Sequence, residues 1–249
     1  MSSSPTRSPR EPDFGRRAEI YDDLRPGIPD LDEALVAAAD LRGRRVLDVG
    51  CGTGRFAEVL ATKYGARVFG LDATPKMLEV AQRRAAPGLA FKAGRAEQLP
   101  FRDGWFERAT MVLACHLVDR PKAFGELRRV LVSEGRVGLV TFDPAYFPRY
   151  YMCEFFPSFV EVDLARFPSG ETLKQELRAA GFASASVELF ARDATIDRET
   201  ALNRIRGRHI STFDLISDDE YEHGLARAEQ ELPAEIAYWW EMLVVIAGP

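Results

Sequence analysis

The chain has 249 residues, 46% of them hydrophobic, with a formal net charge of −5 and three cysteines, Cys51, Cys115 and Cys153. The acidic balance disfavours nucleic acid as a partner, and an odd number of cysteines without paired spacing predicts a reducing compartment and no metal site. No apolar run reaches the length of a transmembrane span, and the N-terminus lacks a signal-peptide core, so we expect a cytoplasmic protein without a membrane partner.

The N-terminal part of the chain divides into a tail and a cap. Residues 1–13 are rich in Ser, Pro and Arg and offer almost nothing to bury, which predicts a disordered tail. Residues 14–40 contain two helical patterns separated by Pro26-Gly27-Ile28-Pro29, so we expect an N-terminal helical cap. With this cap, residues 14–249 have the length of a single α/β domain whose core covers residues 41–143.

A glycine turn follows the first strand of the predicted core. Residues 45–49 are an apolar run typical of a buried strand, and Gly50, Gly52 and Gly54 come next at alternate positions. Without Cβ atoms, these residues let a ligand approach the backbone closely. From Arg55 onward, apolar residues recur at helical spacing as far as Gly65. Strand, glycine turn and helix form the first unit of a Rossmann-like sheet, with the ligand at the carboxyl end of the strand.

Two acids narrow the choice of ligand. Asp72 ends the next apolar run, about 20 residues after the glycine turn, where an acid reaches a ribose diol. NAD and S-adenosylmethionine both carry that diol. Asp48 lies just before the glycines, where a carboxylate would repel a pyrophosphate and attract the ammonium of a methionine tail. We therefore favour S-adenosylmethionine, with dinucleotide binding and a purely structural glycine turn as the alternatives.

The later elements are predicted from periodicity and turn residues. We expect strands over residues 67–71, 106–114, 136–142, 183–190 and 238–247, with a short strand ending at Phe91. Helices are expected from Pro75, over residues 121–131 and over residues 172–180.

Four motifs in this order resemble those of the class I S-adenosylmethionine-dependent methyltransferases. They are VLDVGCGTG (46–54), FGLDATPKML (69–78), FKAGRAEQLPF (91–101) and LRRVLVSEGRVGLV (127–140). The similarity covers residues 14–143, and the subgroup includes the ubiquinone/menaquinone C-methyltransferases and many small-molecule methyltransferases. It implies an α/β fold: a Rossmann-like, mostly parallel seven-stranded sheet with helices on both faces, an antiparallel last strand and helical or aromatic lid insertions. The implied cofactor is S-adenosyl-L-methionine.

The resemblance also implies which residues bind the cofactor. The set is Tyr21, Arg25, Asp48, Gly50, Cys51, Gly52, Gly54, Asp72, Ala73, Met77, Ala96, Glu97 and Val112. Tyr21 would close over the methionine end, or else serve only in packing, and Arg25 would pair with the cofactor carboxylate. Met77 would lie against the adenine or belong only to the core.

Two positions depart from the family or leave their role open. Relatives often have an Asp where this chain has Arg95, which has no acceptor atom, so the backbone of Ala96 or the carboxylate of Glu97 would have to bind the adenine amino group. His116 follows the strand over residues 106–114 and would face the methyl group. By the resemblance it is the candidate catalytic residue, acting as a proton acceptor; the alternatives are that it orients a water or packs against the cofactor.

Two insertions are expected to act as lids, over residues 144–169 and 198–232. The first is dense in aromatic residues, and we expect it to roof a substrate pocket formed by His116, Tyr146, Tyr150, Tyr151 and Phe155. Alternatively, these rings attach the lid to the core or form the interface of a homodimer. The second insertion is charged and mostly helical, and its His209 and His223 are expected at the surface.

The sequence thus predicts an enzyme that transfers a methyl group from S-adenosylmethionine to a small, apolar or aromatic acceptor, at oxygen, nitrogen or carbon. The transfer is an in-line displacement that needs orientation above all, so the cofactor motifs do not identify the acceptor. Two alternatives stay open: a protein that binds S-adenosylmethionine without transferring methyl groups, and a methyltransferase that acts on RNA or protein.

Overall fold

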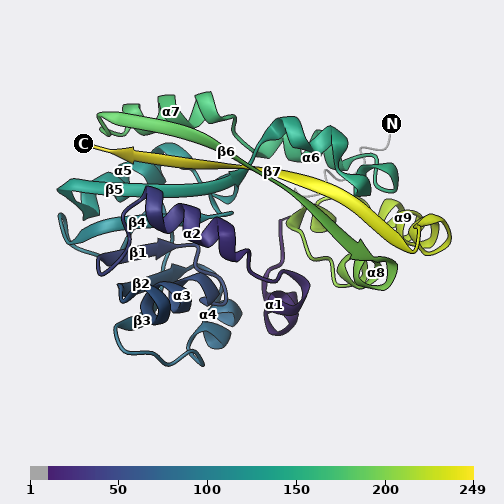
Figure 1. Cartoon of the computed structure of the whole chain (residues 1–249), viewed down its shortest axis with the longest axis horizontal. Helices are drawn as coiled ribbons and strands as arrows, with labels where there is room; N and C mark the ends of the chain where they lie inside the picture. Colours follow the sequence, from purple (N-terminus) through teal and green to yellow (C-terminus); the bar gives the residue numbers. More distant parts are fainter. Residues whose placement is uncertain (1–10) are drawn as a thin grey trace, which may run out of the picture.

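The computed structural model describes residues 11–249, so most of the expected disordered tail lies outside the described residues. Within this range seven strands form one sheet in the order β3-β2-β1-β4-β5-β7-β6 (Figure 1). Their bounds are β1 Arg45–Val49, β2 Arg67–Asp72, β3 Leu89–Ala93, β4 Phe106–Val112, β5 Leu131–Phe142, β6 Ser184–Asp197 and β7 Glu235–Gly248. Strands β1 to β5 pair in parallel, whereas β7 is antiparallel to both β5 and β6. The predicted Rossmann-like fold with an antiparallel last strand is confirmed.

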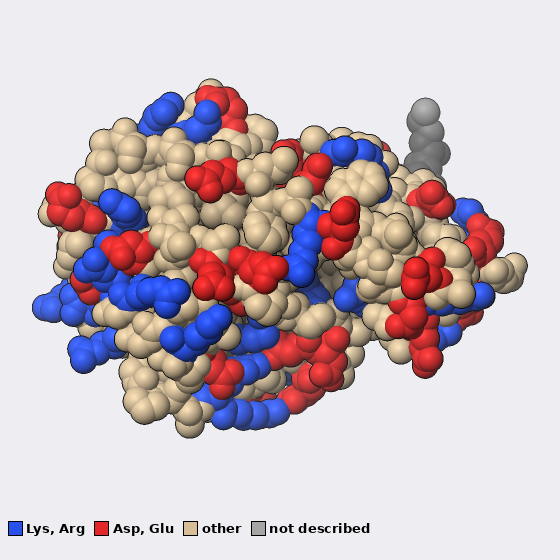
Figure 2. Space-filling model, in the orientation of Figure 1, with Lys and Arg blue, Asp and Glu red and all other residues tan. Residues whose placement is uncertain are grey.

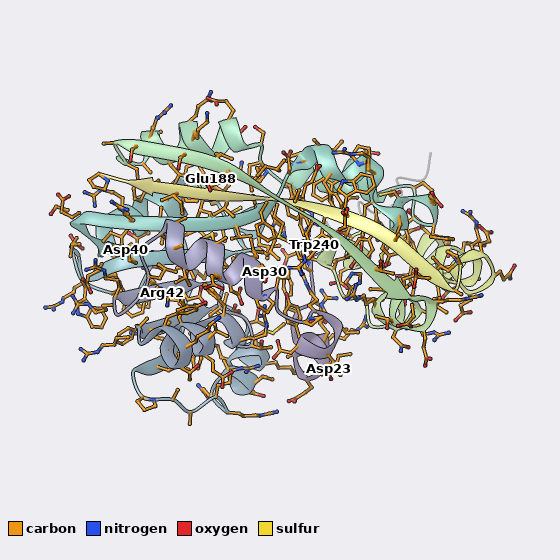
Figure 3. The ribbon with its side chains drawn as sticks, in the orientation of Figure 1. Asp23, Asp30, Asp40, Arg42, Glu188 and Trp240 are labelled. Carbon is orange, nitrogen blue, oxygen red and sulfur yellow. The ribbon has the colours of Figure 1, made fainter. Side chains whose placement is uncertain are left out.

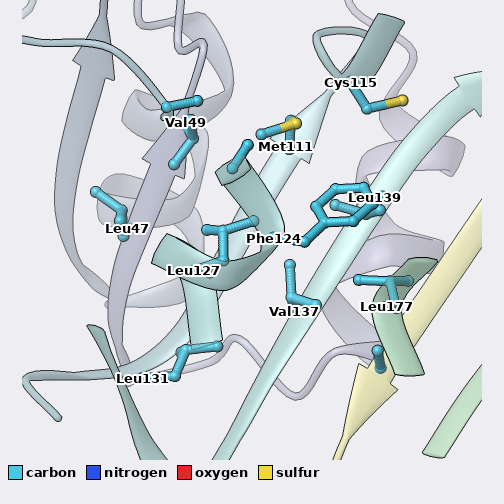
Figure 4. Packing of buried hydrophobic residues seen from close by; sticks show 14 of the residues in the cluster. Leu47, Val49, Met111, Cys115, Phe124, Leu127, Leu131, Val137, Leu139 and Leu177 are labelled. Atoms are coloured by element: carbon cyan, nitrogen blue, oxygen red, sulfur yellow. The ribbon is translucent and has the colours of Figure 1, made fainter. Parts of the chain in front are cut away.

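Helices cover both faces of the sheet because the strand residues alternate between two buried clusters. Leu47 and Val49 of β1 pack with Phe124 of α5 (Arg120–Val130) and Leu177 of α7 (Gly170–Ala179), as Figure 4 shows in part. Val46, one position before Leu47, belongs to the opposite cluster, with residues of α2 (Pro29–Ala38) and α3 (Arg55–Tyr64). Because β1 to β5 are parallel, their carboxyl ends all lie at the same end of the sheet, and the glycine turn lies there.

The last two strands are longer than the sequence predicts. β6 continues to Asp197, seven positions past the expected end at residue 190, and pairs with β7 along its whole length. Only the inner halves of these strands belong to the sheet of the core; the outer halves extend beyond it (Figure 1). Charged residues such as Arg192 and Asp193 stand in the outer half of β6 and hide its strand pattern in the sequence.

The outer halves of β6 and β7 support a second body, which we call the helical lobe. It contains α6 (Phe159–Arg166), α8 (Arg198–Arg206), α9 (Asp218–Glu231) and the 3-10 turns η3 (Pro144–Arg149), η4 (Tyr151–Glu154) and η5 (Ser211–Asp214). Its core joins the two insertions, because Phe156 of the first packs edge-on against Phe213 of the second at a centroid distance of 5.0 Å. The two predicted lids are thus parts of one packed unit.

The N-terminal cap connects the two bodies through η1 (Gly15–Ile20) and α1 (Tyr21–Leu24). Arg17 is 2% exposed and forms an ion pair of 2.5 Å with Asp214 of the helical lobe. Asp22 accepts a hydrogen bond of 2.7 Å from the Thr53 hydroxyl of the glycine turn. Arg84, after α4 (Pro75–Ala81), also pairs with Asp22. We infer that residues 14–249 form one domain, in which the cap closes over the sheet edge.

No helix within residues 11–249 is long and apolar enough to cross a bilayer.

Candidate active site

A cavity of about 340 Å³ lies between the glycine turn and the helical lobe. In Figure 2 the surface is recessed between the core of the sheet and the helical lobe, and basic side chains line part of that recess. Many residues expected at the site line this cavity together, although they come from distant parts of the chain. They are Tyr21, Arg25, Asp48, Gly50, Cys51, Gly52, Val112, His116, Tyr146 and Tyr150.

Other expected residues lie outside the cavity wall. Asp72 ends β2, Ala73 follows it, and Ala96 and Glu97 follow β3. Gly54 precedes α3, and Met77 of α4 is only 2% exposed. A Cβ at Gly54 would meet the ring of Phe91 at 2.5 Å, so this glycine is required for packing. Tyr151 and Phe155 belong to the core of the helical lobe instead of the cavity wall.

The glycine turn is open toward the cavity at its centre. Gly50, Gly52 and Gly54 have φ values of 71°, 54° and 76°, which favour glycine. The amides of Gly50 and Cys51 both donate to the carbonyl of Leu71 and so fix the turn on β2. A Cβ at Gly52 would meet no atom within 4 Å, so a ligand can lie directly against this backbone.

Asp48 lies at the carboxyl end of β1 and is only 2% exposed. Its carboxyl group accepts a hydrogen bond of 2.8 Å from the hydroxyl of Thr110 on the neighbouring strand β4. Burial raises the pKa of Asp48 to about 7, against the opposing effect of this hydrogen bond. A cation placed in the cavity would compensate for the buried charge, which fits the ammonium of a methionine tail.

Asp72 lies at the end of β2, and both of its oxygens already hold the backbone. One accepts from the amide of Gly52 at 2.8 Å and the other from the amide of Thr74 at 2.8 Å. These contacts orient the carboxylate across the glycine turn, and each oxygen keeps a lone pair for a further donor. The arrangement suits a ribose diol that lies between the turn and the start of α4.

Tyr21 and Arg25 belong to the cap and line the cavity. A guanidinium nitrogen of Arg25 donates to the Tyr21 hydroxyl at 3.4 Å, and the guanidinium lies 5.8 Å from the centre of that ring. The hydrogen bond from Thr53 to Asp22 keeps this segment in contact with the glycine turn. The two side chains are therefore positioned to cover a ligand bound at the turn.

His116 follows β4 and lies at the border between the glycine turn and the aromatic wall. Its ring is stacked on Phe167, and its Nδ1 is buried without a hydrogen-bond partner among residues 11–249. Burial, with Arg166, Arg25 and Arg120 nearby, holds the pKa of His116 well below its usual range. Leu113, three positions before His116, has a φ of 53°. This left-handed conformation is strained for any residue other than glycine, and such residues cluster at functional sites.

Aromatic residues from two strands and the first insertion form an apolar wall. Phe142 and Tyr146 are stacked with centroids 5.5 Å apart, and Phe147 packs against Phe167 at 4.8 Å. β7 contributes Tyr238, Trp240 and Met242, which share one face of the strand because they are two positions apart. Figure 3 places Trp240 where the strand passes from the core to the helical lobe.

The second insertion supplies the polar side of the cavity, and here one expectation is wrong. His209 is not a surface residue but is 7% exposed and lines the cavity. Its Nδ1 lies 3.1 Å from the carbonyl of Arg204, and its Nε2 lies 3.5 Å from the Tyr150 hydroxyl. Burial and the guanidiniums of Arg25 and Arg204 lower the pKa of His209, so the ring is neutral at pH 7. His223, in contrast, is exposed, as expected.

Sequence reasoning missed several cavity residues, chiefly Arg204, His209, Asp163, Tyr238 and Trp240. One signal was available for β7, since alternation along residues 238–242 places Tyr238, Trp240 and Met242 on one face. For α8 and the residues after it no local signal exists. These residues reach the site only because the helical lobe folds back against the cap.

The comparisons with known proteins agree with this geometry. The family model described as a methyltransferase domain matches residues 46–135. The demethylmenaquinone methyltransferase of Thermus thermophilus is 33% identical over 204 residues, covering 66% of this chain and 91% of that relative. A probable tocopherol O-methyltransferase of Oryza sativa is 32% identical over 140 residues, which cover 52% of this chain but only 39% of that protein.

A solved structure of an antibiotic biosynthesis pathway protein from Anabaena variabilis has the same fold, with a TM-score of 0.73, 22% identity and coverage of 91% of this chain and 99% of that one. The chain belongs to the class I S-adenosylmethionine-dependent methyltransferases, in the subgroup of the demethylmenaquinone and ubiquinone enzymes. Its cofactor is S-adenosyl-L-methionine.

The residues of the cavity fit this cofactor. The open backbone at Gly52 admits a ligand, and Asp48 offers a buried acid for the ammonium. Arg25, which has no carboxylate partner among residues 11–249, is suited to the cofactor's own carboxylate. Asp72 is suited to the ribose, from just outside the cavity wall.

Proposed function

We propose that this methyltransferase acts on a small apolar or aromatic molecule that binds in the cavity beside the glycine turn. The observation that carries the proposal is the continuity of one cavity, which begins at Gly52 and ends at an aromatic wall formed by Phe142, Tyr146 and Trp240. A flat or apolar acceptor gains contact area on such a wall, whereas a charged polymer does not. The relatives named for demethylmenaquinone and tocopherol support a ring-bearing acceptor.

The chain's residues have three tasks in this proposal. Asp48, Arg25 and Asp72 fix the cofactor at both ends, and its sulfonium then supplies an activated methyl group. The aromatic wall holds the acceptor so that its nucleophilic atom is in line with that methyl, and orientation of this kind can contribute on the order of 7–11 kcal/mol to lowering the barrier. His116 lines the same cavity, and its Nδ1 has no hydrogen-bond partner among residues 11–249, which supports a role in accepting a proton or a hydrogen bond from the acceptor.

Two other functions remain as outcomes of a test. Methyl transfer to RNA is disfavoured by the net charge of −5, and binding of the cofactor without transfer leaves the aromatic wall without a purpose. The aromatic rings of the first insertion pack inside the chain, mostly against each other and the helical lobe, so their burial does not require a homodimer.

The test is incubation of the purified protein with S-adenosylmethionine and a fractionated metabolite extract. We expect the demethylated cofactor to form together with a small product that is heavier by one methylene group. The Asp72→Ala variant serves as the control with impaired cofactor binding. Methylation confined to the protein or RNA fraction, or cofactor binding without any product, would contradict the proposal.

A further inference from the structure

The acids that line the cavity all have partners. Asp22 accepts from Thr53 and pairs with Arg84. Asp48 accepts from Thr110 at 2.8 Å. Asp163 is 5% exposed, forms an ion pair of 2.6 Å with Arg166 and accepts a hydrogen bond of 2.9 Å from the Thr212 hydroxyl. Asp22 and Asp163 are therefore neutralised by arginines, and Asp48, whose partner is a neutral hydroxyl, is left for the ammonium of the cofactor.

In contrast, two of the three arginines that line the cavity have no carboxylate partner among residues 11–249. Arg55 forms an ion pair of 3.7 Å with Asp32. Among residues 11–249, Arg25 and Arg204 form no ion pair, although both side chains are half-buried and line the cavity. Removing a guanidinium from water without a counter-ion is unfavourable, so each of these sites favours an anionic ligand.

The two guanidiniums come from distant parts of the chain, and both lie close enough to His209 to lower its pKa. Arg25 stands at the end of α1, in contact with Tyr21 and close to the glycine turn through the cap. Arg204 lies in the last turn of α8 in the helical lobe, where it donates to the Tyr238 hydroxyl at 3.1 Å. The neutral ring of His209 also lies against the backbone of Arg204 and adds no positive charge of its own.

We propose that Arg204 binds a carboxylate group of the methyl acceptor, which makes the acceptor an aromatic or apolar monocarboxylic acid. The inference rests on the proposed function and specifies its substrate class. The cofactor brings one carboxylate, for which Arg25 is the matching partner, so one guanidinium is left for the acceptor. A planar guanidinium matches a carboxylate with two parallel hydrogen bonds. The Tyr238 hydroxyl accepts a hydrogen bond from one guanidinium nitrogen of Arg204 and so orients it. The neighbouring rings of Trp240 and Tyr150 suit the apolar part of the acceptor.

The test measures binding of matched probes by calorimetry in the presence of saturating S-adenosylhomocysteine, which occupies the cofactor side. The acids are benzoate, cinnamate and 2-naphthoate, and each is compared with its neutral amide and, for the smallest ring, with phenyl phosphate. We expect at least one acid to bind about 10- to 100-fold more tightly than its amide. Arg204→Gln should remove that preference, whereas Arg206→Gln, on the same helix but exposed and paired with Glu229, should keep it.

The remaining outcomes distinguish failure of the carboxylate site from failure of the aromatic pocket. If amides bind as well as acids, or if Arg204→Gln keeps the preference, the carboxylate site is refuted while the aromatic pocket stands. Tighter binding of phenyl phosphate than of benzoate would replace the carboxylate by a phosphate ester and also refute the inference. If S-adenosylhomocysteine binds but neither acids nor amides do, both the inference and the proposed small aromatic acceptor are refuted. A melting curve of Arg204→Gln confirms that the variant is folded.

Discussion

The imidazole of His116 is stacked on the ring of Phe167, with centroids 3.9 Å apart and planes inclined by 17°. This contact fixes the plane of the imidazole, while its Nδ1 stays free of protein partners within the described residues. We expect His116→Gln to lower turnover by about 10²- to 10⁴-fold if Nδ1 takes a proton from the acceptor. Cofactor affinity should stay within a few-fold. Because the pKa of His116 is far below its usual range, wild-type turnover at saturating cofactor should be constant between pH 6.5 and 8.

Phe167→Leu is the control for this prediction, because it removes the stacked ring and leaves the nitrogen in place. Its turnover should fall much less than that of His116→Gln. Equal losses in the two variants would mean that His116 acts only through packing.

The buried position of Asp48 predicts that cofactor affinity depends on pH. The pKa of Asp48 is about 7 in the free protein, and the ammonium of the cofactor favours the ionised carboxylate, so binding releases a proton. Affinity should therefore rise by about tenfold between pH 6 and pH 8. Calorimetry in buffers of different ionisation enthalpy measures the released proton directly. In Asp48→Asn the affinity should be lower and the pH dependence should be absent; an unchanged pH profile would assign the proton to another group.

Asp72 provides the second cofactor contact. Replacement by Ala removes a carboxylate placed for the ribose, and charge-assisted hydrogen bonds contribute roughly 1.5–3 kcal/mol, so affinity should fall about 10- to 100-fold. The same carboxylate holds the amides of Gly52 and Thr74, so the variant must be compared with Asp72→Asn, whose amide oxygen can still accept one of them. An unchanged dissociation constant in a folded Ala variant would place the ribose elsewhere.

Tyr150 and Tyr151 are neighbours with different surroundings, which gives a paired prediction. Tyr150 lines the cavity, whereas Tyr151 packs on Tyr238 at 5.4 Å in the core of the helical lobe. Tyr150→Ala should reduce acceptor turnover more than tenfold and leave cofactor affinity within a few-fold. Tyr151→Ala should instead lower the melting temperature, since loss of a packed ring costs about 3–5 kcal/mol. The reverse pattern would move the acceptor away from the aromatic wall.

The sequence alone was enough to predict the sheet and the cofactor side of the site. The glycine turn after β1, and the acids at the ends of β1 and β2, are local features whose spacing is fixed by the strand–turn–helix unit. Parallel strands bring their carboxyl ends to one edge, so Asp48, Gly52 and Asp72 had to lie close together. The predicted bounds of β1, β2 and β4 agree with the structure within two residues. They were too short for β5, which begins at Leu131 instead of residue 136, and for β6, whose outer half is charged.

Only the tertiary structure decided the acceptor side. Arg204 and His209 lie at least 150 positions beyond the glycine turn in the sequence, and no periodicity links them to it. They reach the cavity because β6 and β7 extend past the core and carry the helical lobe, which packs on the cap through Arg17 and Asp214. Local patterns encode strands, turns and helices, whereas the pairing of charges inside a cavity depends on which segments the fold brings together. That is why the paired acids and the two unpaired guanidiniums became visible only in three dimensions.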